Sequence, residues 1–150
     1  VSMSSTRSLE EDESGHWMKK TAAREGHRVV YHGVVPDRVE DIRETVQEVI
    51  RNLSPHALLL SGGTGVSPGD VTIEAVKPLF DKELAAFGTL FTYLSFEEVD
   101  SAAMLSRAAA GIIGETVVFC MPGSLKACRL ACKNLIFPEL GHLVNHVRSP

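Results

Sequence analysis

The ten residues Ser61–Asp70, SGGTGVSPGD, directly follow the apolar run Ala57–Leu60, ALLL, and this junction decides the fold. A short apolar run that ends at glycines is typical of a strand whose two faces are both buried. Glycines let the chain turn sharply and let the backbone approach a ligand closely. Free amides and hydroxyls bind phosphate oxygens, and an aspartate can hold a divalent metal ion. The junction therefore indicates a phosphate site, with a metal ligand, at the end of a buried strand.

Segments that favour strands alternate with segments that favour helices along the whole chain. The expected strands are 1–5, 27–35, 57–62, 105–114 and 116–123, the last two joined by a tight turn near Gly114-Glu115. The expected helices are 10–26, 36–52, 72–80, 83–99 and 124–147, with Thr72 as a cap and an interruption near Pro138. This alternation predicts a mostly parallel sheet between two layers of helices, with an antiparallel fourth strand.

Length and composition predict one globular domain that spans residues 1–150. The chain is 44% hydrophobic and 23% charged, which is typical of soluble domains. Its net charge of −4 and the absence of a basic stripe argue against nucleic-acid binding. No run is long enough to cross a membrane and no signal peptide is recognisable, so we expect a cytoplasmic protein. Because the chain opens inside an expected strand, we also expect residues ahead of Val1.

The cysteines and two of the histidines have spacings that invite a metal or redox interpretation. Cys120, Cys128 and Cys132 lack CxxC spacing, and we expect them to fill the core. His142 and His146 lie four residues apart on an expected helix, as a metal pair would. No third ligand is close in sequence, so we expect a solvated helix end instead.

Loops that follow parallel strands meet at one edge of a sheet, where ligands bind. The loops expected there are the serines after the first strand, Pro36-Asp37, 61–70 and 122–124, with 105–107 joining them from the antiparallel strand. No lysine follows the glycines as in a Walker A loop, and GxGxxG is absent. Asp70 either holds a metal ion or caps the next helix. The residues alone thus predict a phosphate site, with a tight corner as the alternative for the glycines and with magnesium binding and a helix cap both open for Asp70.

Several longer motifs carry a resemblance that covers essentially the whole chain. They are SGGTG (61–65), FDKEL (80–84), FGTLF (87–91), LSFEEV (94–99), LSRAAAG (105–111) and PGSLKACR (122–129). Together the chain resembles the MoaB/MogA family of molybdenum-cofactor biosynthesis proteins, and EEDESGH (10–16) and SPGD (67–70) are most similar to its MoaB branch. The resemblance implies a three-layer α/β/α sandwich around a mostly parallel, mixed five-stranded sheet.

The resemblance also implies an activity, the adenylylation of molybdopterin by ATP and Mg²⁺. The terminal phosphate of the pterin attacks the α-phosphorus of ATP, pyrophosphate leaves, and molybdate or tungstate enters in a later step, for which a separate insertase is an expected partner. Gly62, Gly63, Thr64 and Gly65 match the nucleotide-phosphate loop of the family. Asp70 matches the acidic residue that serves magnesium and catalysis, and Asp37 matches a second acid near the pterin.

Five further residues fall in segments that line the family's pocket. They are Ser2, Ser106, Arg107, Gly123 and Ser124. For Ser2 and Ser106 a plain strand-end hydroxyl remains an alternative. Asp37 is alternatively an ordinary acid at a helix start.

Two departures from the family pattern bear on activity. Gly69 stands where many members have arginine before the metal-binding aspartate, and Leu125 stands where many have proline. We expect an active adenylyltransferase. Two alternatives stay open: a molybdopterin-binding scaffold without catalysis, and a nucleotide hydrolase of the competence-damage-inducible type.

The segment 83–96 places apolar residues on more than one helix face. They are Leu84, Phe87, Leu90, Phe91, Tyr93, Leu94 and Phe96. A helix that buries a single stripe would not need them all, so we expect a partner surface as well as a core. Members of the family form trimers, and those of the MoaB branch form hexamers, so the resemblance implies a homo-trimer or hexamer.

Overall fold

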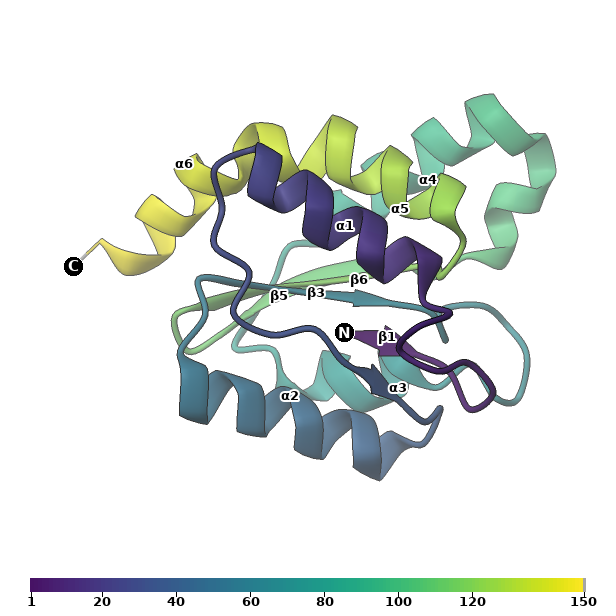
Figure 1. The fold of residues 1–150 in the computed structure, drawn as a ribbon. Helices are drawn as coiled ribbons and strands as arrows, with labels where there is room; N and C mark the ends of the chain where they lie inside the picture. Colours follow the sequence, from purple (N-terminus) through teal and green to yellow (C-terminus); the bar gives the residue numbers. More distant parts are fainter. Residues whose placement is uncertain (150) are drawn as a thin grey trace.

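The computed structural model describes residues 1–149 and shows a mixed six-stranded sheet (Figure 1). Its strands are β1 (Ser2–Met3), β2 (Val34–Val35), β3 (Ala57–Ser61), β4 (Lys82–Glu83), β5 (Ala109–Ile113) and β6 (Thr116–Met121). They lie in the order β2-β1-β3-β6-β5-β4. The neighbours from β2 to β6 pair in parallel, and β5 is antiparallel to both β6 and β4.

Helices cover both faces of the sheet, which confirms the three-layer sandwich. They are α1 (Glu13–Arg24), α2 (Val39–Leu53), α3 (Thr72–Val76), α4 (Ala85–Val99), α5 (Leu125–Ala131) and α6 (Phe137–Arg148). Figure 1 shows α2 and α3 below the sheet and the other four above it. None of the helices within residues 1–149 combines the length and the apolar character needed to cross a membrane.

The central strand β6 shows how the sequence serves two cores at once. Val117, Phe119 and Met121 pack with α1, α4, α5 and α6, whereas Val118 and Cys120 pack with α2 and α3. Successive side chains of a strand point to opposite faces, so a continuous apolar run is what a doubly covered strand requires. All three cysteines are buried as predicted, and burial raises the pKa of the Cys120 thiol to about 12. These thiols are packing groups.

All five expected strands are shorter in the structure than in the sequence prediction, and 27–35 differs most. Of the expected strand 27–35, Val34 and Val35 pair with β1 in the described structure, and Ser2 N–H donates to the Gly33 carbonyl. Residues 27–32 and the strand β3 line a cavity of about 430 Å³. Residues 105–108 also stay outside β5. The added sixth strand, β4, is a two-residue edge strand ahead of α4.

The helix boundaries follow the predicted breaks, with one correction. Thr72 is not a cap: it is the first residue of α3, and its hydroxyl donates to the Gly62 carbonyl at 2.8 Å. The last helix is interrupted as predicted, by the π-helical turn Cys132–Ile136 just before Pro138. Proline has no N–H to continue the α-helical pattern, and a π turn absorbs the mismatch.

Candidate functional site at the carboxyl edge of the sheet

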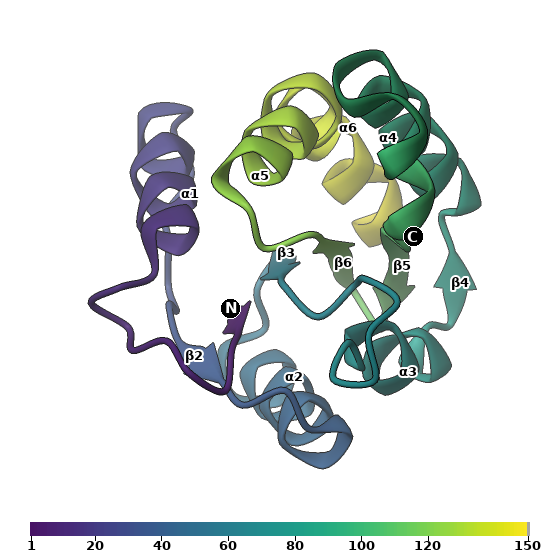
Figure 2. The same cartoon turned by 90° about the vertical axis from the view of Figure 1, so that its right-hand side faces the viewer.

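The carboxyl ends of β1, β3 and β6 lie side by side at the edge that faces the viewer in Figure 2. The loops that follow them, 4–12, 62–71 and 122–124, therefore meet there. β1 lies between β2 and β3, so the chain leaves β1 toward one side of the sheet and later returns on its other side. Ligands of open α/β sheets bind at such a switch point.

The glycine loop, residues 62–70, starts with a conformation that only glycine adopts easily. Gly62 and Gly63 have φ angles of +102° and +62°. A Cβ on Gly62 would lie 2.6 Å from the Met3 carbonyl oxygen, and one on Gly63 would lie 2.4 Å from Thr72 Oγ1. Gly62 N–H donates to the Met121 carbonyl at 2.9 Å, which ties the loop to β6. The loop is thus held close against β1 and α3.

The glycine loop presents a run of free hydrogen-bond donors. Within residues 1–149, the N–H groups of Gly63, Thr64, Gly65 and Val66 have no acceptor. In the same part of the chain, Thr64 Oγ1 and Ser106 Oγ are buried without a partner. Successive free N–H groups form a concavity that binds anions. The amides of Gly63, Gly65 and Val66 belong to residues that solvent reaches, whereas a ligand reaches the two hydroxyls only if the loop shifts.

The two predicted acids lie beside this loop, each with one carboxylate oxygen engaged. Asp37 Oδ2 accepts from the N–H and hydroxyl of Ser5 at 2.7 and 3.0 Å. Asp70 Oδ2 accepts from Ser67 N–H at 2.9 Å. A Cβ on Gly63 would lie 3.4 Å from Asp37 Oδ1, and one on Gly65 would lie 3.5 Å from Asp70 Oδ1. One oxygen of each acid therefore borders the glycine loop.

Neither acid caps a helix. The residue that caps α3 is Val71, and the residue that caps α2 is Arg38; neither helix has a side-chain capping bond. The structure thus shows no capping role for Asp37 or Asp70, and Asp37 lies two residues before the start of α2. It ties Asp37 to the loop after β1 and Asp70 to the turn at Ser67.

Arg107 contacts the glycine loop directly. It also pairs with Glu74, an acid that the sequence analysis did not name. Its guanidinium donates to the carbonyls of Gly65 and Asp70 and pairs with Glu74 of α3. The hydrogen bond from Arg107 holds the pKa of Glu74 below its ordinary value. Its position in the first turn of α3 was the only feature of the sequence that pointed to Glu74.

The segment after β6 packs directly on the glycine loop. A Cβ on Gly123 would lie 3.1 Å from the Cα of Gly62, a tight contact that glycine avoids. Ser124 caps α5, its hydroxyl accepting from Ala127 N–H at 3.2 Å. Gly123 thus borders the site through backbone contact, and the Ser124 hydroxyl is occupied by its helix.

Ser2 belongs to a separate buried polar group, which we call the Asp12 cluster (Ser2, Asp12, Gly15 and His32). Ser2 Oγ donates to Asp12 at 2.6 Å, and His32 Nε2 lies 2.9 Å from the same carboxylate. Asp12 also accepts from Gly15 N–H at 3.1 Å. Burial alone would raise the pKa of Asp12, but the hydrogen bonds from Ser2, His32 and Gly15 outweigh it and lower that pKa. The Ser2 hydroxyl is therefore engaged inside the fold.

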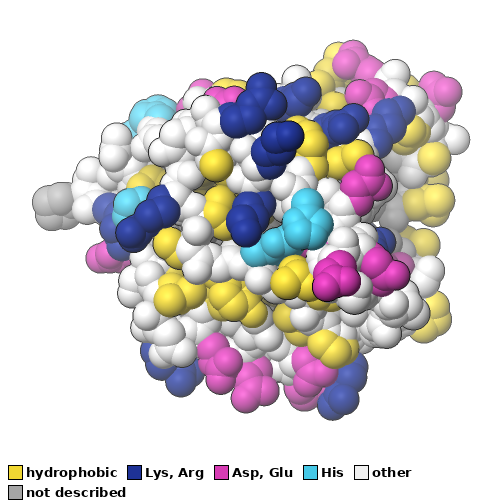
Figure 3. Space-filling model, viewed as in Figure 1, with side chains coloured by type: hydrophobic (Ala, Val, Ile, Leu, Met, Phe, Trp, Pro, Cys, Tyr) yellow, Lys and Arg dark blue, Asp and Glu magenta, His cyan; other side chains and the backbone are white. Residues whose placement is uncertain are grey.

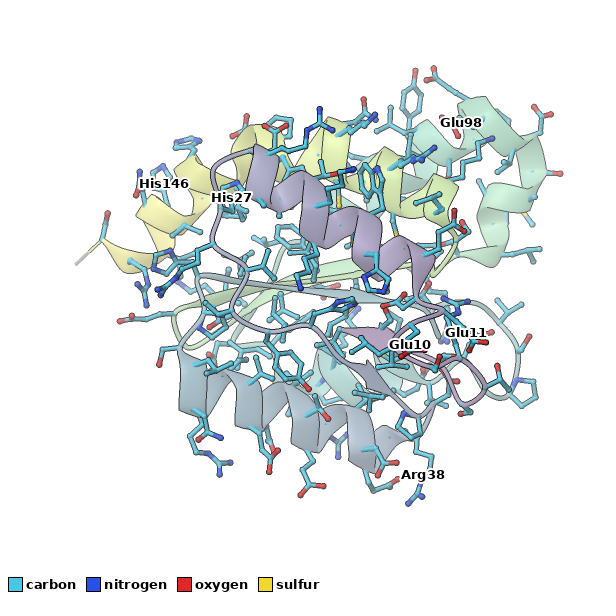
Figure 4. All side chains as sticks on the ribbon, viewed as in Figure 1. Glu10, Glu11, His27, Arg38, Glu98 and His146 are labelled. Atoms are coloured by element: carbon cyan, nitrogen blue, oxygen red, sulfur yellow. The ribbon has the colours of Figure 1, made fainter. Side chains whose placement is uncertain are left out.

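The histidine pair lies far from this edge. His142 and His146 are exposed, with Nε2 atoms 2.9 Å apart, and His142 Nδ1 lies 3.2 Å from Glu139. Figure 4 shows His146 at the end of the molecule opposite Glu10, Glu11 and Arg38, which border the glycine-loop edge. In the part of the chain described, no cluster of three or more histidine, cysteine or acidic side chains could hold a metal ion. A metal ion at Asp37 and Asp70 would need ligands from its substrate.

Comparison with known proteins agrees with the geometry of this edge. Residues 1–142 match the family described as "Probable molybdopterin binding domain". Molybdenum cofactor biosynthesis protein B of Bacillus subtilis (strain 168) is 43% identical over 150 residues, which cover 99% of this chain and 88% of the relative. A Methanocaldococcus jannaschii relative named "Probable molybdopterin adenylyltransferase" is 40% identical, covering 93% of this chain and 82% of its own.

Solved structures of related proteins indicate the same family. A crystal structure of a molybdenum cofactor biosynthesis protein B is 44% identical with a TM-score of 0.94, covering 98% of this chain and 92% of its own. The tungsten cofactor synthesizing protein MoaB from Pyrococcus furiosus is 36% identical with a TM-score of 0.89, covering 99% and 94%. The chain therefore belongs to the MoaB/MogA family of molybdenum-cofactor biosynthesis proteins, on its MoaB branch.

Proposed function

We propose that this protein transfers the adenylyl group of ATP to molybdopterin, with the ATP phosphates bound at the glycine loop. The observation that carries the proposal is the run of four N–H groups, Gly63 to Val66, that have no acceptor in residues 1–149. Successive N–H groups that no carbonyl accepts form a concavity that favours an anion, and Gly63, Gly65 and Val66 are open to one from solvent. The name of the Methanocaldococcus relative supports the same reaction.

The reaction asks the chain for positioning and for charge stabilisation. A terminal phosphate oxygen of molybdopterin forms a bond to the α-phosphorus of ATP, and the bond to pyrophosphate breaks. No side chain becomes covalently attached, so no Ser-His or Cys-His pair is required. Catalysis of transfer between anionic oxygens rests on alignment and on donors that stabilise the developing charge. The free N–H groups of the glycine loop supply such donors.

Asp37 and Asp70 fit a magnesium ion. Each has one carboxylate oxygen, Oδ1, that borders the glycine loop and has no hydrogen-bond partner within residues 1–149. Mg²⁺ is usually bound through one or two carboxylates together with substrate phosphates and water, which matches a site with two acids. Mg²⁺, when bound, neutralises negative charge on the phosphates. The two acids hold the position of that charge relative to the loop.

The test is a direct assay of both products. Purified protein is supplied with molybdopterin and Mg-ATP, and adenylylated pterin and pyrophosphate are quantified. We expect them to form in equal amounts. Pterin binding without pyrophosphate would assign the protein to the scaffold alternative, and ATP consumption without pterin would assign it to the hydrolase alternative.

One observation favours the scaffold alternative. Gly69 removes a cation that many family members have, and the Arg107 guanidinium is already engaged by Gly65, Asp70 and Glu74. The glycine loop contains no arginine, and the guanidinium of Arg107 is not free to bind the triphosphate. The product assay separates this alternative from the enzyme, because a scaffold binds the pterin and releases no pyrophosphate.

We further propose that the protein assembles as a trimer or hexamer through the face that α4 leaves uncovered. Leu90, Tyr93 and Phe96 of α4 are 50%, 61% and 55% exposed. Met104 and Leu105 follow on the next turn and are exposed as well. Figure 3 shows apolar side chains along the right-hand edge, over the end of α4. Light scattering of the purified chain tests this: a monomer at micromolar concentration would contradict it.

A molybdenum or tungsten insertase is the partner that we propose acts next. Adenylylated molybdopterin has to pass to a protein that exchanges the adenylyl group for the metal. The product assay can be extended by adding such an insertase, and we expect it to consume the adenylylated pterin.

A further inference from the structure

Arg107 is bound to the glycine loop at three points. Its backbone N–H donates to the Thr64 carbonyl at 2.9 Å. Its Nε donates to the Gly65 carbonyl at 2.7 Å, and its Nη2 donates to the Asp70 carbonyl at 2.8 Å. One residue from the segment before β5 thus fixes both ends of the stretch 64–70.

Glu74 fixes the guanidinium in turn. Its Oε1 contacts Arg107 Nη1 and its Oε2 lies 3.3 Å from Nη2, so the pair is bidentate. The two side chains are 36% and 49% exposed, and exposed ion pairs contribute little to the stability of a fold. We therefore expect this ion pair to matter by orienting the guanidinium of Arg107, not by stabilising the fold.

The direction of two carbonyls determines the direction of two amides. In a trans peptide unit the N–H points opposite to the C=O. Because the Thr64 and Gly65 carbonyls point to Arg107, the N–H groups of Gly65 and Val66 point away from it. These are two of the four N–H groups that have no acceptor in the described chain. Arg107 therefore turns the free donors of the loop toward the opposite side.

We propose that Glu74 and Arg107 form a clamp that sets the conformation of the glycine loop, so that its N–H groups are presented to phosphate. Both are positioning residues: Arg107 acts on a phosphate ligand through the loop rather than by touching it. The phosphate part of this proposal rests on the proposed function. The control of loop conformation does not depend on any ligand.

The direction in which Glu74→Ala changes ATP affinity distinguishes the clamp from a purely electrostatic effect. Glu74→Ala removes a negative charge near a site for a triphosphate and frees a guanidinium. If charge alone mattered, ATP would bind this variant more tightly. The clamp predicts the opposite, a loss of ATP affinity on the order of tenfold, because the loop amides lose their alignment. Calorimetric titration with ATP measures it, and unchanged or tighter binding overturns the proposal.

Two more variants isolate the geometry. Arg107→Lys keeps the positive charge but cannot reach Gly65, Asp70 and Glu74 at once, so we expect it to lose affinity as Glu74→Ala does. Glu83→Ala is the matched control, since Glu83 forms an ion pair of similar exposure with Lys77 at 2.8 Å, away from the loop. We expect wild-type affinity for it. Full affinity in Arg107→Lys would show that charge suffices, which contradicts the clamp.

Hydrogen exchange without ligand distinguishes failure of the clamp from failure of the proposed function. The amides of Asp70, Thr72 and Arg107 are bonded to carbonyls of the glycine loop. We expect them to exchange faster in Glu74→Ala than in the wild type and in Glu83→Ala. If the wild type binds no ATP but this difference appears, the phosphate site is wrong and the control of loop conformation stands. Equal exchange in all three proteins overturns the clamp.

Discussion

Two groups of polar atoms lie near the same edge of the sheet, and they differ in whether their hydrogen bonds are made within the chain. In the Asp12 cluster, one fully buried carboxylate accepts from Ser2, Gly15 and His32. At the glycine loop, four consecutive N–H groups and two hydroxyls have no partner within residues 1–149. A satisfied buried cluster belongs to the architecture, whereas the unpaired donors of the glycine loop are those that we propose bind phosphate. We therefore assign folding to the Asp12 cluster and the proposed binding to the glycine loop.

Asp12→Ala should give the largest effect of all and should act on folding. It leaves the donors of Ser2, Gly15 and His32 unpaired inside the fold. We expect the free energy of unfolding to fall by about 3 kcal/mol, as measured by urea denaturation. Asp41→Ala is the control, because Asp41 pairs with Arg38 on the surface at 3.4 Å, and we expect it to cost less than about 1 kcal/mol. Equal costs would remove the distinction between the two acids.

Asp70→Asn should act on the reaction and not on the fold. The asparagine oxygen can still accept from Ser67 N–H, so the turn and the melting temperature should be preserved. The loss of negative charge at the metal position should slow adenylylation on the order of a hundredfold. Pyrophosphate release at saturating molybdopterin and Mg-ATP measures the change. Equal rates in both proteins would reduce Asp70 to a turn residue.

The glycine loop and its acids could be predicted from the sequence because their signals are local. A run of glycines after an apolar strand, and single aspartates just past strand ends, can be read within ten residues of chain. The sheet order brought these loops together as expected. Asp37 and Asp70 both border the loop in the structure.

The Asp12 cluster and the pair of Glu74 with Arg107 could not be predicted in the same way. Their partners are separated by 10, 20 and 33 residues, and only the order of the strands brings them together. The expected strand 27–35 was wrong for a related reason. Valines at 29 and 30 favour extended backbone, but a strand also needs pairing, and within residues 1–149 the structure pairs only Val34 and Val35 of this segment.

Two buried threonines allow an unpaired hydroxyl to be compared with a hydrogen-bonded one in the same residue type. Thr64 is 2% exposed and its hydroxyl has no partner, whereas Thr72 is fully buried and its hydroxyl donates to the Gly62 carbonyl. Thr64→Val should leave the free energy of unfolding unchanged or slightly higher and weaken ATP binding on the order of tenfold.

Thr72→Val is the matched control for that change. It should cost about 1 to 2 kcal/mol of stability, because it removes the donor to a buried carbonyl. Chemical denaturation and calorimetric titration of the two variants give the comparison. A destabilised Thr64→Val with normal affinity would place Thr64 in the architecture instead.

The most direct test of the proposed phosphate donors is to measure the NMR chemical shifts of the loop amides. In ¹⁵N-labelled protein titrated with ATP, hydrogen bonds to phosphate should move the amide proton signals of Gly63, Gly65 and Val66 downfield. Gly26 and Gly114 serve as controls, since their N–H groups are already bonded to Ala23 and Asp81. The account predicts large shifts in the loop and none at the control glycines. Loop signals that stay in place while ATP binds would contradict it.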